Sequence, residues 1–126
     1  MAAQSATAAS PEAGAALTKA VVRAAQRLGL SQRELASVIG VSAATVSRMR
    51  TGRYQLSPQD KSWELAALLV RLFRSLDSLT GGDEAAAAAW LHSENGHLHA
   101  MPAELIGQVQ GLVDTLAYVD SFRARV

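Results

Sequence analysis

The chain of 126 residues can bury one modest hydrophobic core or two small ones, which is too little for a large enzyme domain with a deep cleft. It contains no cysteine, and this excludes disulfides, thiolate metal sites and a cysteine nucleophile. No apolar run approaches the roughly 18 to 20 residues that a membrane span requires, so we expect a soluble, cytoplasmic protein with no membrane partner.

The net charge of +1 conceals an uneven distribution along the chain. Between Lys19 and Arg53, seven basic residues stand against one acidic residue. From Tyr54 to Val126, five basic residues stand against nine acidic ones. A basic front third followed by an acidic remainder predicts two faces with two kinds of partner.

The first sixteen residues, MAAQSATAASPEAGAA, have mostly small side chains. They lack the basic and apolar regions of a signal peptide. We therefore expect residues 1–16 to form a disordered tail outside the fold.

Apolar residues recur at spacings of three and four through the rest of the chain, which predicts an all-α fold. A capping box of Ser31 and Glu34 predicts one helix start, and Ser42 predicts another. Three helices are expected in the front third: about Leu17–Leu28 ending at Gly29, Ser31 to about Val38, and Ser42 to Gly52.

A long helix is expected next, entered through the sequence SPQD at residues 57–60. From Trp63 to Leu79 it is apolar around much of its circumference, which predicts burial against both halves of the chain or against a second copy. Further helices are predicted after the cap at Asp83, from Pro102, and from about Gln108 to Arg123.

The segment SQRELASVIGVSAATVSRMRTG, residues 31–52, has the spacing of two short helices that cross over a tight turn. Such a crossing needs a small residue where the backbones approach and a flexible one in the turn, and Ala36 and Gly40 supply them. Over about Leu17 to Pro58 the pattern resembles the helix-turn-helix of the Xre and lambda-repressor-like family. An ordinary amphipathic helix pair would explain the apolar spacing, but not the short polar face of the second helix.

This resemblance implies that the chain binds operator DNA as a homodimer on an inverted repeat. It also assigns roles to two groups of residues by their positions in the motif. The base-reading residues would be Ala43, Ala44, Ser47 and Arg48, and the phosphate-binding residues would be Gln32, Thr45, Arg50, Arg53 and Tyr54.

The last forty or so residues resemble the MbcA/ParS/Xre antitoxin toxin-binding domain. The matching elements are Trp90, Leu91, Asn95, Leu98, Pro102 with Leu105 and Ile106, and Gly111 with Leu112, Leu116 and Val119. The chain departs from the family just before the proline, where glycines are common and His99, Ala100 and Met101 stand here.

The second resemblance implies an antitoxin that inhibits a RES-domain toxin, an enzyme that consumes NAD or transfers ADP-ribose from it, and that represses its own operon. Arg123, Arg125 and the carboxylate of Val126 would reach into the toxin's anion pocket and occlude it. On chemistry alone, it is an equal alternative that the two arginines only offset the negative end of the last helix dipole.

These observations predict four segments: a tail (1–16), a helix-turn-helix domain (17–58), a connecting and dimerising helix (59–82) and a toxin-binding domain (83–126).

No nucleophile and base stand at a recognisable spacing, so we expect neither an enzyme nor a cofactor. His92, His97 and His99 lack a fourth metal ligand and are interpreted as surface or capping residues. The alternative function is a stand-alone dimeric helix-turn-helix transcriptional regulator.

Overall fold

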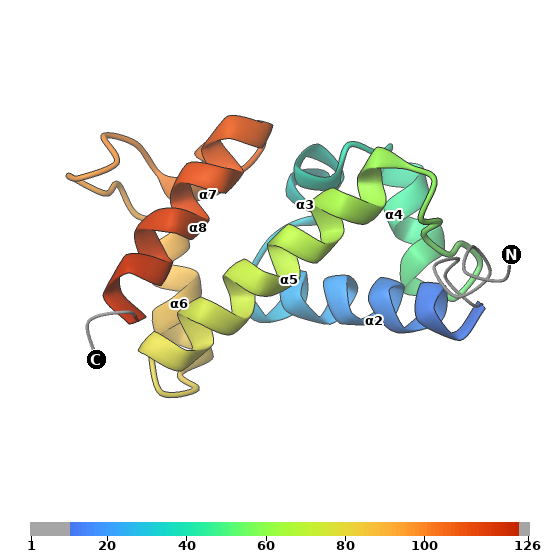
Figure 1. Cartoon of the computed structure of the whole chain (residues 1–126), viewed down its shortest axis with the longest axis horizontal. Coiled ribbons are helices and arrows are strands. Elements are labelled where there is room, and N and C mark those ends of the chain that lie inside the picture. Colours follow the sequence, from blue (N-terminus) through green and yellow to red (C-terminus); the bar gives the residue numbers. More distant parts are fainter. Residues whose placement is uncertain (1–10, 124–126) are drawn as a thin grey trace, which may run out of the picture.

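The computed structural model describes residues 11–123 and is all-α in that range, as the sequence predicts (Figure 1). The only β-bridge among the described residues is an isolated one between Asn95 and Ala100. The helices are α2 (Pro11–Arg27), α3 (Gln32–Ile39), α4 (Ala43–Arg50), α5 (Lys61–Leu79), α6 (Glu84–Leu91), α7 (Pro102–Leu105) and α8 (Val109–Arg123).

In the N-terminal half, α2 and α3 pack against α5, and α4 packs on α2 and α3. Its centre consists of aliphatic side chains that are fully enclosed: Val21, Leu28, Ile39, Val46 and Leu69. Each comes from the apolar stripe of its helix, so amphipathic spacing is sufficient to build this core.

The expectation of a disordered tail over residues 1–16 is wrong for residues 11–16, because α2 begins at Pro11. Gly14 is buried, and a Cβ placed there would lie 3.0 Å from the carbonyl oxygen of Leu56. The Thr18 hydroxyl donates to the Gly14 carbonyl (2.7 Å) and accepts from the Leu56 N–H (3.0 Å). The small side chains that suggest a tail are therefore what lets α2 approach the 55–56 backbone closely. Residues 1–10 lie outside the described range.

The long helix α5 starts at Lys61, three residues after Pro58, where the SPQD segment predicts its entrance. The residue at its N-cap is Asp60, whereas Ser57 belongs to a preceding turn in which its carbonyl accepts from the Asp60 N–H (3.0 Å). The SPQD segment thus leads into the helix through its aspartate and not through its serine.

The apolar circumference of α5 is covered from two sides within one chain, which is one of the two arrangements that the sequence left open. Leu65 and Leu69 are buried, and α2 and α3 pack on this helix. Leu72 and Leu76 are buried in the part of α5 where α6 and α8 also pack. In Figure 1, α5 runs diagonally from α3 and α4 near its upper end to α6 and α8 near its lower end, and α2 lies below it.

The C-terminal half is closed by a sharp corner between α7 and α8. Asp83 caps α6 by accepting from the Ala86 N–H (3.1 Å), and Pro102 occupies the first turn of α7, both as predicted. Leu91, Ile106 and Leu112 are fully buried. At the corner, a Cβ on Gly111 would lie 2.0 Å from the Leu105 carbonyl oxygen, so no other residue fits.

Polar contacts also join the two halves. Arg27 of α2 lies 3.5 Å from Glu84 of α6, and the same guanidinium stands over the Phe73 ring at 5.8 Å. His92, at the end of α6, lies 3.3 Å from Glu34 of α3. The two halves are therefore in direct contact beyond their common helix.

None of the helices in the described range combines the length and the apolarity needed to cross a membrane.

We predict that Gly111→Ala will destabilise the protein by about 3 kcal/mol, because the methyl group overlaps the Leu105 carbonyl and the α7–α8 corner must open. Thermal or urea unfolding of the two variants side by side measures this. The control is Gly96→Ala, where a Cβ meets nothing within 4 Å. Equal stability of the two variants would show that the corner is not tightly packed.

Candidate functional site

The helix-turn-helix segment is held together by the caps that its sequence predicts. The Ser31 hydroxyl accepts from the Glu34 N–H (3.0 Å), and the Glu34 carboxylate accepts from the Ser31 N–H (2.8 Å). Gly40 ends α3 with φ of 74°, a left-handed conformation that glycine adopts without strain. The Ala36 carbonyl accepts from both Gly40 and Val41, so the chain turns sharply and enters α4 at the cap Ser42.

Helix α4 presents one buried side and one exposed side. Val46 and Met49 point into the core. The four residues predicted to read bases are all exposed: Ala43, Ala44, Ser47 and Arg48. Three of them are short, so the backbone of α4 can come close to a flat or grooved partner. Their role in reading bases stays a prediction.

Polar contacts fix the orientation of α4 on α3. Gln32 donates from Nε2 to the Ala43 carbonyl (3.3 Å) and accepts at Oε1 from Arg50 Nη1 (3.2 Å), so one side chain reaches both ends of α4. Arg48 Nη2 donates to Thr45 Oγ1 (3.0 Å), which holds its side chain along the exposed face. Three of the residues predicted to bind phosphate, Gln32, Thr45 and Arg50, therefore also brace the motif.

The other two predicted phosphate-binding residues follow α4 directly. Arg53 is exposed, and its N–H donates to the Arg48 carbonyl (2.8 Å). Tyr54 is half-buried and packs against the core. The structure thus brings all nine residues of the predicted DNA-binding set to α4 and its immediate surroundings.

A cluster of ring side chains lies on the C-terminal half. The Tyr118 ring stacks on His97 (centroids 4.7 Å apart) and on Trp90 (6.4 Å), and it meets the Phe122 ring edge to face (5.0 Å). Phe122 remains 38% exposed and His97 is exposed, so the cluster is part of the surface. Trp90 is half-buried, and its inner side packs against the hydrophobic core.

The loop from Asn95 to Ala100 is organised by Asn95. Its side-chain oxygen accepts from the N–H groups of His97 and Leu98 (both 2.9 Å), and its carbonyl accepts from His99 (2.8 Å). His99 has φ of 63°, the left-handed region that favours glycine. The histidine thus stands in a glycine-type conformation just where glycines are common in the resembled family.

The three histidines do not converge in the structure. His92 faces Glu34, His97 stacks on Tyr118, and His99 occupies the strained turn. Among residues 11–123 no group of three histidine, aspartate or glutamate side chains is placed to hold a metal ion.

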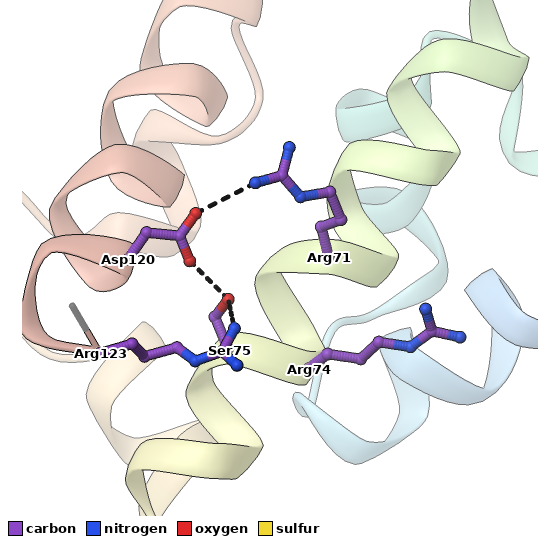
Figure 2. Close-up of a pocket in the computed structure, with 5 residues that line it drawn as sticks. All are labelled: Arg71, Arg74, Ser75, Asp120 and Arg123. Carbon is purple, nitrogen blue, oxygen red and sulfur yellow. Dashed lines mark hydrogen bonds and ion pairs between the residues drawn. The ribbon is translucent and has the colours of Figure 1, made fainter. Parts of the chain in front are cut away.

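Arg123 is predicted to reach toward a toxin. The residue is exposed, but its side chain folds back onto α5. Its Nη1 donates to the Ser75 hydroxyl (3.1 Å), Ser75 donates to Asp120 (2.7 Å), and Asp120 accepts from Arg71 Nη2 (3.1 Å) (Figure 2). Arg125 and Val126 lie outside the described residues. Sequence reasoning missed this network, because its members are separated by 45 to 49 positions and no local pattern links them.

A helix pair that crosses over a tight turn and exposes its second helix, joined through α5 to a second helical domain, defines a helix-turn-helix protein with two domains. Comparison with protein families agrees with this. Residues 7–71 match the antitoxin Xre-like helix-turn-helix domain, and residues 75–125 match the antitoxin Xre/MbcA/ParS C-terminal toxin-binding domain. The chain therefore belongs to the Xre/MbcA/ParS-type antitoxins, which are binding and regulatory proteins and not enzymes. A search of curated proteins found no match.

We predict that His99→Gly will stabilise the protein by about 1 kcal/mol, because glycine adopts the left-handed conformation without the cost that a Cβ brings. The melting temperature should rise by about 4 °C for a chain of this size. His99→Ala keeps the Cβ and should show no such gain. A rise of the melting temperature in both variants would mean that the imidazole, and not the backbone, is the source of the strain.

Proposed function

We propose that this antitoxin neutralises a RES-domain toxin by occluding its active site, and that it binds operator DNA as a homodimer to repress its own operon in the cytoplasm. The observation that carries the proposal is the succession of the two matched domains in one chain, first the helix-turn-helix and then the toxin-binding domain. The match of residues 75–125 to a toxin-binding domain favours this function over a stand-alone dimeric regulator.

The exposed side of α4 supports insertion into a DNA major groove. Arg48 has guanidinium N–H groups left after its bond to Thr45, and such groups can donate in pairs to guanine. Ala43 and Ala44 offer methyl groups that suit contact with thymine. Arg50 and Arg53 supply positive charge for phosphates at the C-terminal end of α4, together with the polar groups of Gln32, Thr45 and Tyr54. One such helix makes few base contacts, which is the reason for proposing a dimer on an inverted repeat.

Exchanging Arg48 and Arg53 for alanine should separate base reading from phosphate binding. Arg48→Ala is expected to lower operator preference by about 1–3 kcal/mol, whereas Arg53→Ala weakens binding to all sequences and reduces the salt slope by about one. Titrations of operator and scrambled duplexes over a range of salt concentrations measure both effects. Arg74→Ala makes the same charge change on α5 and should leave both quantities unchanged. Identical behaviour of all three variants would contradict the assigned roles.

Two features of the C-terminal half support toxin binding. The ring cluster of Trp90, His97, Tyr118 and Phe122 offers partly exposed aromatic surface, the kind of surface that contributes most to protein interfaces. Arg123 and Arg125 bring guanidinium groups to the end of the chain, where they can pair with carboxylate groups of the toxin. The carboxylate of Val126 suits a pocket that accepts the phosphates of NAD. In our proposal the ring cluster docks on the toxin, and the terminal residues through Val126 enter its pocket.

Removing residues 121–126, or extending the chain beyond Val126 with an alanine tail, should abolish neutralisation while operator binding persists. Co-expression with the neighbouring toxin measures growth rescue, and an NAD-consumption assay on the purified partner measures inhibition directly. Retained operator affinity is the control that the variants are folded. Full neutralisation by either variant would exclude occlusion by the C-terminus, and a partner that consumes no NAD would exclude the RES assignment.

A further inference from the structure

A solvent-open pocket of about 390 Å³ lies between α5 and α8 and carries an excess of positive charge. Three guanidinium groups line it, together with one carboxylate and one buried hydroxyl: Arg71, Arg74, Arg123, Asp120 and Ser75. Figure 2 shows that Asp120 and Arg123 come from α8, and that Arg71, Arg74 and Ser75 come from α5. Arg123 also belongs to the proposed toxin contacts, but neither those contacts nor the matched family descriptions assign a ligand to this pocket.

The hydrogen bonds within the pocket use only some of its guanidinium N–H donors. Both oxygens of Asp120 are already engaged, one by Arg71 and the other by Ser75, which is only 2% exposed. Arg71 and Arg123 each use one terminal nitrogen, and a guanidinium has five N–H donors. No hydrogen bond or ion pair with another described residue engages Arg74. One carboxylate therefore balances one of three positive charges.

The residues around Arg74 increase the excess of positive charge. Its side chain points away from Asp120 in Figure 2, and it also lines a neighbouring hollow with Lys19 and Arg23 of α2. None of the residues that line this second hollow is acidic. A concave surface of one charge sign concentrates its field and attracts small ions of the opposite sign.

We propose that the pocket between α5 and α8 binds a small phosphate-bearing anion with at least two negative charges, of the pyrophosphate or nucleoside diphosphate type. Planar guanidinium groups match phosphate oxygens in pairs, which favours phosphate as the recognised group. The uncompensated charge of the pocket calls for a ligand with more than one negative charge, and its volume exceeds the needs of a single phosphate. Arg71 and Arg123 hold the anion over Ser75, and Arg74 turns inward to cover it.

The position of the pocket favours a free anion over the backbone of operator DNA. Helix α4, which carries the proposed DNA contacts, lies on the other side of α5 from α8 (Figure 1). Calorimetric titration of the full chain with pyrophosphate, and separately with a short DNA duplex, distinguishes the two sources of phosphate. The titrations use about 150 mM salt, where exposed surface charges are largely screened beyond about 8 Å.

We expect saturable pyrophosphate binding that Arg74→Gln and Arg123→Gln each weaken about ten-fold, because each loses charge-assisted hydrogen bonds to the anion. Arg33→Gln is the matched control, since Arg33 is an exposed arginine of α3 outside the pocket, and it should leave the affinity within two-fold. Melting curves of all three variants check that they are folded. The expected pattern supports the pocket as the binding site.

Three results would each overturn the proposal. The first is the absence of saturable pyrophosphate binding. The second is a loss of pyrophosphate affinity in Arg33→Gln as large as in the two pocket variants. The third is that duplex binding depends on Arg74 while pyrophosphate binding does not. The first two results do not bear on the proposed toxin and operator contacts, because their readout is the anion itself. The third would in addition extend the DNA contacts to Arg74.

Discussion

The structure depends on one constraint: α5 is apolar around most of its circumference and must be covered from two sides. Burying side chains such as Leu65, Leu69, Leu72 and Leu76 contributes about 2 kcal/mol each, whereas exposed ion pairs such as Arg27–Glu84 contribute at most about 1 kcal/mol. Hydrophobic burial therefore joins the halves, and the polar contacts between them fix their relative orientation. The boundary between the two matched families falls inside α5, so the two domains are joined by a helix to which both contribute.

The fold determines where the unevenly distributed charges of the sequence lie on the surface. The basic front third keeps exposed arginines on α4 and just after it, where the proposed DNA contacts lie. Several acidic residues of the later part pair with basic ones: Glu84 with Arg27, and Asp120 with Arg71. The later acids therefore do not form a purely acidic face, and the surface between α5 and α8 remains positive despite the acidic sequence around it.

The parts that could be predicted from the sequence are those that local chemistry determines. The capping box at Ser31, the left-handed Gly40 and the cap at Asp83 act within a few residues, so their sequence signals are sufficient. The parts that were missed depend on contacts between distant segments. The start of α2 at Pro11 depends on the 55–56 backbone, and the ring cluster depends on α6, the 95–100 loop and α8 meeting at Tyr118. The network from Arg71 to Arg123 likewise forms only once α5 and α8 are packed.

The common helix α5 also determines how the protein unfolds. When either half opens, the side of α5 that it covered is exposed to water, and the remaining half loses the support that kept this helix in place. Opening of one half therefore weakens the other, so we expect the two halves to unfold together as one cooperative unit.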